Sequence, residues 1–369
     1  MSQWQFFNPP KINTLNSISG LLFDESVSLD VALTSTNLVV VMDYLNGTDA
    51  QVEQVKEHRT RYKLPLKIIL DYSFESGTSS NIINAKLDTY AGLGIDMSNV
   101  LLFLNNATHS PKDYNYIKCQ YELVDLFALS AVIRYTRFKH PVSTTSVVNR
   151  PLMLNLLIGK LEKSLRSETI YQFYKNGLFD RTRFGILGTI RELRRAVRVR
   201  DSQFFSDVVP YLKPFDNVIS FSTNEGKSSE GWSGSCEIYD STSVSYVCET
   251  HDNISYPNVT STFITEKTYR PIINRHPFVI QSTAGFLENL HKKGFITFSK
   301  YIDESYDNYT SLDPTRVSNL VNTANSLLKA VPKYSSEIQS IVNHNARCLT
   351  YNATVEQRRV RKIIENFLK

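Results

Sequence analysis

Residues 261–298 constrain the fold most, because helix and strand signals alternate along this stretch. Thr265 is a residue type that caps helices with its side-chain oxygen, so a helix is predicted to begin beside it. Pro271 is compatible with that helix only near its first turn, where an N–H is spare. Residues 278–280 are a short apolar run, which is typical of a buried parallel strand.

The alternation continues after this run. Thr283 is predicted to cap a second helix, Gly294 to end it, and residues 295–298 to begin the next strand. Strands that are joined by helices in this way pair in parallel, so the stretch predicts an α/β fold.

The first part of the chain repeats this pattern. Residues 37–42, 66–70 and 100–104 are apolar runs rich in β-branched residues or leucine, and each is followed by a polar residue. Residues 49–62 and 82–93 are predicted to be the helices between them. The pattern indicates a parallel sheet, whose ligands bind beyond the carboxyl ends of its strands.

Acidic residues follow two of these runs. Asp43 comes after the first, and Asp71 and Glu75 come after the second. A carboxylate at the carboxyl end of a parallel strand can act as a general base that takes a proton from an acceptor hydroxyl. Asp71 or Glu75 is the predicted base, with Asp43 behind them. The alternative is that each aspartate only caps the following helix.

The helix start at Thr265 carries two cations, Lys267 and Arg270. A helix amino-terminus offers unpaired N–H groups and a positive dipole end, so cations beside it form a seat for phosphate or pyrophosphate. Glu266 cannot serve a phosphate, and its carboxylate is suited to accept hydrogen bonds from ribose hydroxyls. The alternative is a surface helix start whose charges are solvated.

The motif FITEKTYRP, followed by HPFVI, KGFITF and IDESYD, resembles the donor-binding half of fucosyltransferase-like glycosyltransferases, in a group common in bacteria and tailed phages. The likeness covers residues 152–307. It implies the GT-B fold, which has two Rossmann-like α/β domains with a cleft between them. It also implies that the Glu-Lys pair holds a nucleotide sugar, for which a UDP-sugar is favoured.

The resemblance extends to two upstream segments. A predicted strand at residues 152–158 is followed by basic residues and a helix that ends near KNGL, and a later strand ends at Glu-Thr. The residues that the resemblance places at the donor are Lys160, Arg166, Glu249, Thr265, Glu266, Lys267 and Arg270. In this interpretation Glu249 and Glu266 face the ribose, and the cations face the diphosphate. For the basic residues of 160–166, an exposed helix face is the alternative.

The polar segment 138–150 indicates a domain boundary. The prediction is an acceptor domain at residues 1–145, a donor domain at 146–350 and a last helix at 351–369 that can cross back to the first domain. Further helices are predicted at residues 121–135, 315–330, 335–345 and 355–368, and further strands at 217–222 and 243–248; a helix at 189–200 is the alternative for the arginine-rich segment.

The net charge of +5 conceals a concentration of arginines between residues 181 and 200. Four of them are predicted to contact a polyanion: Arg191, Arg194, Arg195 and Arg198. Such a cluster suits nucleic acid or the phosphates of a donor. The alternative is an amphipathic helix whose arginines face solvent.

Three hypotheses for function follow. The first is a glycosyltransferase whose acceptor is a hydroxymethylated pyrimidine in double-stranded phage DNA, reached by flipping the base. The second is a glycosyltransferase that acts on a carbohydrate or a lipid-linked glycan. The third is a non-catalytic nucleic-acid-binding protein on the same fold.

The cysteines, the apolar runs and the first residues of the sequence predict that the protein has no essential metal, no membrane span and no signal peptide. The 4 cysteines lack metal-site spacing, and no Asp-x-Asp follows a strand of the second domain, so we expect no essential metal. No apolar run approaches the roughly 20 residues that span a bilayer, and the first residues lack a signal-peptide core. A cytoplasmic protein is expected, in the host cytoplasm if the chain is phage-encoded.

Overall fold

The structure is a computed structural model. It describes residues 5–7, 38–43, 49–61, 66–72, 80–105, 119–136, 141–158, 164–186, 188–189, 193, 202–211, 218–219, 236–250, 262–308 and 314–369. The chain divides into two compact units, one of Met1–Arg134 with Asn352–Lys369 and one of Tyr135–Tyr351. The sequence placed the first boundary at residue 145, whereas this division falls near the end of helix α5 (Leu126–Thr136).

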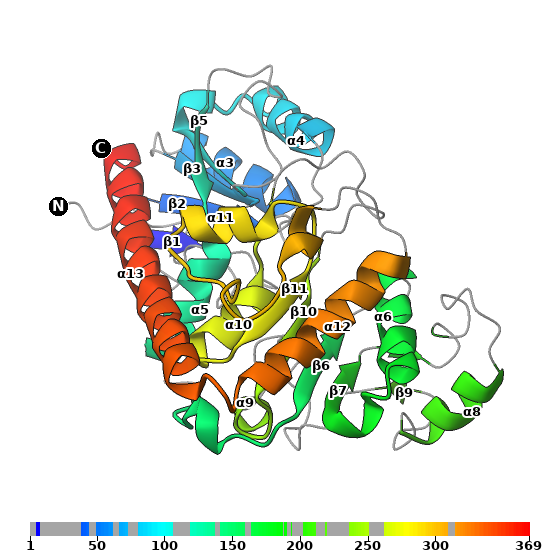
Figure 1. The fold of residues 1–369 in the computed structure, drawn as a ribbon. Coiled ribbons are helices and arrows are strands. Elements are labelled where there is room, and N and C mark those ends of the chain that lie inside the picture. The colour runs from blue at the N-terminus through cyan, green and yellow to red at the C-terminus, as the bar shows by residue number, and fades with distance from the viewer. Residues whose placement is uncertain are drawn as a thin grey trace. The chain divides into compact units, whose positions relative to one another are not determined.

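The first unit is built on a parallel sheet in the order β1-β2-β3-β4-β5 (Figure 1). Its strands are β1 (Gln5–Phe7), β2 (Leu38–Asp43), β3 (Leu66–Tyr72), β4 (Val100–Asn105) and β5 (Gln120–Val124). The helices between them include α3 (Asp49–Arg61) and α4 (Ser80–Gly92). The three strands and two helices predicted for this region are confirmed.

Alternate residues of β3 point to opposite faces of this sheet, as the pleat requires. Ile68 and Leu70 lie in a core cluster with Leu87 of α4, whereas Ile69 lies in a second cluster with Leu129 of α5. Both faces of the sheet are therefore covered, which explains the continuous apolar runs in its strands.

The second cluster is completed by the last helix, α13 (Ser335–Phe367). Val360, Ile364 and Phe367 pack there, and Arg359 forms an ion pair of 3.0 Å with Glu122 of β5. The sequence predicted two helices, at 335–345 and 355–368. The structure has one helix of 33 residues, because no proline or glycine interrupts the intervening segment.

Replacing Ile364 with valine is expected to lower the free energy of unfolding by about 1 kcal/mol, because one buried methylene is lost from this cluster. Glu365→Gln, on the exposed side of the same turn, should change it by less than about 0.5 kcal/mol. Urea unfolding of both variants measures the difference. Equal, small effects would contradict the packing of the last turns of α13 on the sheet.

The predicted helix at residues 121–135 is wrong in its first part. Gln120–Val124 is strand β5, which pairs with β4, and the helix begins only at Leu126. Asp125 separates the two elements, since its carboxylate accepts a hydrogen bond of 3.1 Å from the N–H of Ala128. This is the geometry of a helix cap, and it starts α5 later than the apolar pattern indicated.

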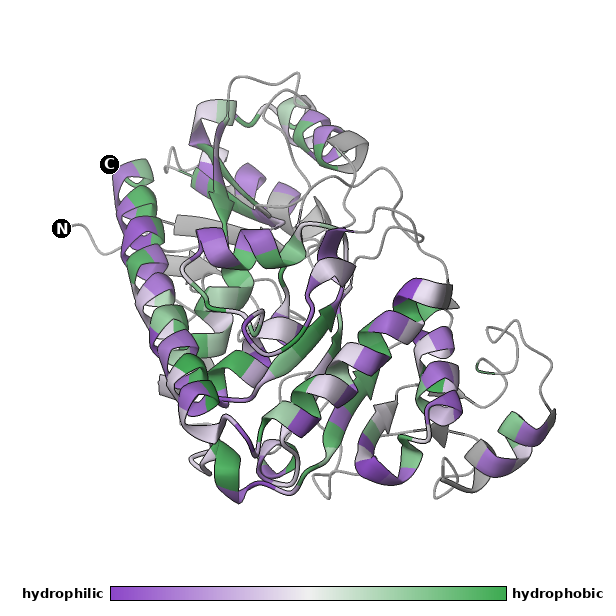
Figure 2. Cartoon of the chain, viewed as in Figure 1, coloured by the Kyte–Doolittle hydropathy of each residue, from purple (hydrophilic) through white to green (hydrophobic). Residues whose placement is uncertain are grey.

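The second unit is built on a parallel sheet in the order β11-β10-β6-β7. Its strands are β6 (Leu154–Ile158), β7 (Thr182–Ile186), β10 (Val244–Cys248) and β11 (Phe278–Gln281). Their apolar residues are green in Figure 2. The chain leaves β6 on one side for β7 and returns on the other side as β10, so the strand order reverses between β6 and β10.

Helices cover both faces of this sheet. On one face, Phe173 of α6 (Ser164–Lys175) packs edge to face on Tyr246 of β10, and α12 (Pro314–Ala330) lies against α6 and β11. On the other face, α10 (Glu266–Ile273) lies against β10. The α/β fold with parallel sheets is thus confirmed.

Three predictions for the second unit need correction. The helix after β11 is α11 (Phe286–Lys292); Gly285, with a φ of 73°, is its N-cap instead of Thr283. Residues 295–298 are not a strand. The N–H and carbonyl of Ile296 instead bond to the side chain of Asn345, at 2.8 Å each, and this amide replaces a neighbouring strand.

The third correction concerns residues 188–219. Gly188–Thr189 is strand β8, which pairs antiparallel with β9 (Val218–Ile219). Thr189 therefore belongs to a strand, so the helix considered at 189–200 does not begin there. The one other described residue of that segment, Leu193, is helical and buried, as that alternative expects. The strand predicted at 217–222 is described only at these two positions of β9.

Among the helices that the structure describes, none combines the length and the apolar character needed to cross a bilayer.

Candidate functional site

Helix α10 begins where the sequence predicted. Thr265 has extended backbone angles, and its hydroxyl oxygen accepts a hydrogen bond of 3.2 Å from the N–H of Lys267, so Thr265 is the N-cap. Pro271 lies in the second turn of this eight-residue helix, later than expected, and removes one intrahelical donor there. The start of the helix therefore depends on bonds from outside it.

Glu249 supplies those bonds. It follows β10 directly and is 2% exposed. One of its oxygens accepts from the N–H of Thr265 at 3.0 Å and from the hydroxyl of Thr268 at 2.6 Å. The other accepts from the hydroxyl of Thr265 at 2.6 Å and from the N–H of Thr250 at 3.0 Å. Glu249 therefore fixes the start of α10 at the carboxyl end of β10.

Arg166 reinforces this junction from α6. Its side chain is buried, and a guanidinium nitrogen donates to the carbonyl of Glu249 at 3.1 Å. The sequence interpretation placed Glu249 at a ribose and Arg166 at a diphosphate. Their observed contacts are within the chain, and they position the helix that carries Glu266 and Lys267.

Glu266 and Lys267 form an ion pair at this helix start. The Lys267 ammonium lies 2.5 Å from a carboxylate oxygen of Glu266, 3.1 Å from the hydroxyl oxygen of Thr250 and 3.4 Å from that of Thr265. Burial raises the pKa of Glu266, but the charge and hydrogen bond of Lys267, together with the charge of Arg270, outweigh burial and hold the pKa below its ordinary value. Glu266 is therefore ionised at neutral pH.

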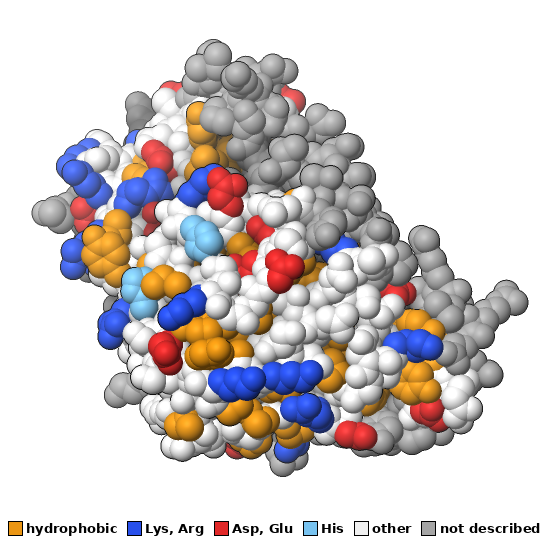
Figure 3. Space-filling view, in the orientation of Figure 1, with side chains coloured by type: hydrophobic (Ala, Val, Ile, Leu, Met, Phe, Trp, Pro, Cys, Tyr) orange, Lys and Arg blue, Asp and Glu red, His pale blue; other side chains and the backbone are white. Residues whose placement is uncertain are grey.

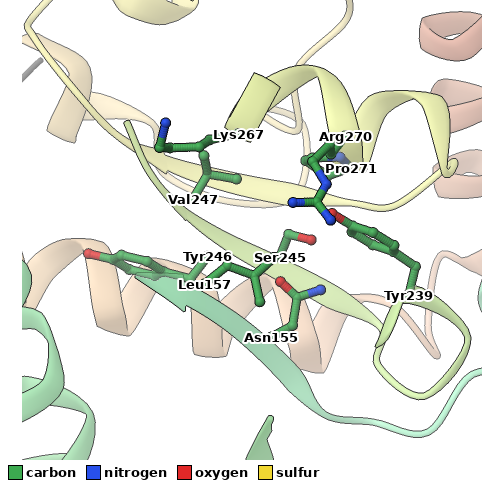
Figure 4. A pocket seen from close by; sticks show the side chains of 9 residues that line it. All are labelled: Asn155, Leu157, Tyr239, Ser245, Tyr246, Val247, Lys267, Arg270 and Pro271. Atoms are coloured by element: carbon green, nitrogen blue, oxygen red, sulfur yellow. The ribbon is translucent and has the colours of Figure 1, made fainter. Parts of the chain in front are cut away.

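A pocket lies between α10 and the sheet (Figure 4). Its lining residues come from β6, α9 (Glu237–Asp240), β10 and α10: Asn155, Leu157, Tyr239, Ser245, Tyr246, Val247, Lys267, Arg270 and Pro271. The empty space is about 330 Å³, which includes part of its open mouth. The pocket lies over β6 and β10, between which the strand order reverses; open parallel sheets bind ligands at such switch points, beyond the carboxyl ends of the strands.

The two sides of the pocket differ in chemistry. Lys267 and Arg270 extend from α10 on one side, and Asn155 and Ser245 rise from the strands on the other, as Figure 4 shows. Cations on one wall and uncharged polar groups on the other can hold a ligand that is anionic at one part and hydroxyl-rich at another.

Ser245 is oriented by a buried histidine. The Nε2 of His276 lies 2.7 Å from the carbonyl of Thr242, so this nitrogen carries the proton. The Nδ1 of His276, 2.8 Å from the hydroxyl of Ser245, must then accept from it. Burial, helped by the charge of Arg150, lowers the pKa of His276 to about 3. A base this weak does not activate Ser245 as a nucleophile at neutral pH.

Arg150 fixes the turn after α10. Its buried guanidinium donates to the carbonyls of Asn274 and Arg275, at 3.0 and 2.9 Å, and to the hydroxyl of Ser143 at 2.9 Å. Burial lowers its pKa to about 10, so it stays charged at neutral pH. These bonds hold Arg275 at a φ of 52°, which side-chain-bearing residues seldom adopt.

The IDESYD segment also has an observed role. The carboxylate of Asp307 accepts from the N–H groups of Phe286 and Leu287, at 3.1 and 2.9 Å. Glu304 accepts from the hydroxyl of Thr297 at 2.7 Å and from the N–H of Phe298 at 2.8 Å. This segment therefore supports the start of α11 and the loop that follows that helix.

The predicted bases lie in the first unit. Asp43 and Asp71 occupy paired positions at the carboxyl edge of β2 and β3, and Asp71 is buried. The register thus brings two of the three predicted carboxylates to neighbouring strands. Glu75 lies outside the described residues.

Other predicted site residues also lie outside the described part of the chain. They are Lys160, Arg191, Arg194, Arg195 and Arg198. From the same arginine-rich segment, Arg181 and Arg183 are described and exposed. On the face drawn in Figure 3, charged side chains of both signs are interspersed.

Of the residues that line the pocket, only Lys267 and Arg270 belong to the predicted site; its polar residues Asn155, Tyr239 and Ser245 do not. Asn155 lies in the strand segment that carries the family resemblance, and Ser245 interrupts an apolar strand run, which was the available signal. Tyr239 lies on α9, a four-residue helix that was not predicted. Among the described residues, no group of three or more histidine, cysteine or acidic side chains is arranged to hold a metal ion.

No protein-family model matches the chain, and no match to a curated protein is found. The likeness to fucosyltransferase-like enzymes therefore stays a prediction that rests on the quoted motif.

Proposed function

We propose that the protein is a glycosyltransferase of the GT-B type, which transfers a sugar from a nucleotide-sugar donor to a hydroxyl acceptor. The observation that carries the proposal is the pocket at the switch point of the second sheet. Two cations of one short helix line it, and the helix start is fixed to the carboxyl end of β10.

In this proposal Lys267 and Arg270 bind the diphosphate of the donor. When the sugar leaves, negative charge develops on the nucleoside diphosphate, and fixed cations stabilise that charge without reorganising. Glu266 accepts hydrogen bonds from the ribose. The proton of the acceptor hydroxyl goes to a carboxylate, for which Asp71 or Glu75 stays the predicted base, with Asp43 behind them; of the three, only the side chain of Asp71 is described, and it is buried.

The test is thermal unfolding of the wild type and of Lys267→Ala with a panel of UDP-, GDP-, CMP- and dTDP-sugars. A ligand at 100 times its Kd stabilises the native state by about 2.7 kcal/mol and raises the melting temperature. We expect one nucleotide class to shift the wild type and to lose its effect in Lys267→Ala, because the diphosphate loses a cation.

Lys292→Ala is the matched control. Lys292 is an exposed cation on α11 that pairs with Glu288 at 2.7 Å, outside the pocket. This variant should keep the full shift. Absence of any shift in the wild type, or an equal shift in Lys267→Ala, would count against a donor site at α10.

The hypothesis for the identity of the acceptor rests on the sequence alone. A hydroxymethylated pyrimidine in double-stranded DNA was inferred from the arginine-rich segment, most of which lies outside the described residues. A carbohydrate or lipid-linked glycan acceptor and a non-catalytic nucleic-acid-binding protein stay as the alternatives.

A further inference from the structure

The ammonium group of Lys267, which binds the diphosphate in the proposed function, already donates hydrogen bonds to other side chains of the protein. An ammonium group has three N–H donors. Lys267 lies within hydrogen-bond distance of three acceptors, the carboxylate of Glu266 at 2.5 Å and the hydroxyl oxygens of Thr250 and Thr265 at 3.1 and 3.4 Å. A phosphate that binds Lys267 must therefore displace one of these acceptors.

Glu266 is the acceptor that a phosphate displaces most directly. It is the one anion among the three, so it and a phosphate compete for the same charge. The side chain of Glu266 is 19% exposed and that of Lys267 is 26% exposed, so neither is fully solvated. A carboxylate left in such a place without its cation is costly, unless new donors replace the lost bond.

We propose that Glu266 is an internal competitor that makes this pocket selective for ribonucleoside diphosphates over inorganic phosphates. An inorganic phosphate displaces Glu266 from Lys267 but offers no ribose hydroxyl that could donate a hydrogen bond to the displaced carboxylate. A ligand that carries ribose hydroxyls beside its diphosphate displaces the same carboxylate and then donates to it. The inference rests on the proposed function, because it requires the diphosphate to bind at Lys267.

The contribution of Glu266 to this selectivity is measured with the variant Glu266→Gln, which keeps the shape of the side chain and removes its charge. Isothermal titration calorimetry with UDP, GDP and inorganic pyrophosphate gives the affinities in the wild type and the variant. Pyrophosphate should bind about tenfold more tightly to Glu266→Gln, which corresponds to about 1.4 kcal/mol. The affinity of the nucleoside diphosphate should change by less than about threefold, because the lost repulsion is offset by the weaker acceptor.

The comparison of ligands separates this mechanism from general repulsion. Pyrophosphate and a nucleoside diphosphate carry similar charge, so removal of a nearby negative charge alone would tighten both by the same factor. Equal tightening would overturn the inference, and so would an unchanged affinity for pyrophosphate. Glu288→Gln, which breaks the exposed ion pair with Lys292, should change neither affinity.

Two checks keep the result decisive. Glu266→Asp shortens the side chain and weakens the ion pair, so it should give a smaller gain for pyrophosphate, and it replaces the glutamine variant if that variant fails to fold. Failure of every nucleotide sugar of the thermal-unfolding panel to bind the wild type would overturn the proposed function, and this inference with it. Binding of a donor of that panel without binding of UDP or GDP would overturn the inference alone. Nucleotide binding that is lost in Lys267→Ala, with an unchanged ligand ratio in Glu266→Gln, would overturn the inference alone.

Discussion

Replacing Glu249 with alanine is expected to lower the free energy of unfolding by about 4 kcal/mol. Four donors bond to this carboxylate, and two of them are the N–H groups of Thr250 and Thr265. Each buried donor that loses its acceptor costs about 1–3 kcal/mol, and water can reach only some of these. Urea unfolding at neutral pH measures the loss.

The glutamine variant at the same position separates charge from shape. Glu249→Gln keeps one acceptor oxygen and presents an amide N–H₂ to the other donors, so about half of the loss should remain. Glu288→Ala, which removes an exposed carboxylate of α11, should cost less than about 0.5 kcal/mol. A small effect of Glu249→Ala, equal to that of Glu288→Ala, would show that the start of α10 is held by other contacts.

Acidification is expected to destabilise the protein through His276. Its pKa is about 3 in the folded chain against an ordinary value of 6.5, because burial and Arg150 disfavour its charged form. Between these two pKa values His276 is protonated in the unfolded chain but not in the folded chain, so the free energy of unfolding falls as the pH falls. From pH 7.5 to pH 4 the loss due to this residue is about 3 kcal/mol.

The comparison with His276→Gln isolates this contribution. The stability difference between the wild type and the variant, measured by urea unfolding at each pH, should shrink by about 3 kcal/mol over this range. The comparison is necessary because burial raises the pKa values of Glu304 and Asp307, which makes them favour the folded state as the pH falls. A difference that does not change with pH would mean that His276 titrates normally.

Six strands of the two sheets could be predicted because they are short apolar runs that end at polar residues: β2, β3, β4, β6, β10 and β11. The edge strands β1 and β7 lack such a run and were not predicted. Residues 295–298 have the same composition but form no strand, since the side chain of Asn345 satisfies the backbone of Ile296. That partner lies 49 positions away in the chain, and no local pattern reveals it. The strand β5 was missed for another reason, because its five residues run almost directly into the apolar pattern of α5.

The candidate site was predictable only in its local part. The N-cap at Thr265 and the pair of Glu266 and Lys267 follow from neighbouring residues, and the structure shows both. The role of Glu249 depends on a partner 16 positions away, and the pocket depends on which strands are neighbours. A reversal of strand order is a property of the whole sheet, so the sequence could not bring Asn155 and Ser245 together in one pocket.

The placement of α13 has a consequence for the order in which the chain acquires its structure. The cluster of Ile69 and Leu101 is closed by Val360 and Ile364, which follow the whole second unit in the chain. During synthesis the second unit has all of its residues before the first unit has its own. Strands β3 and β4 therefore wait with one apolar face covered, among the described elements, by α5 alone until the final turns of α13 leave the ribosome, and over that interval the remaining apolar surface is exposed to aggregation.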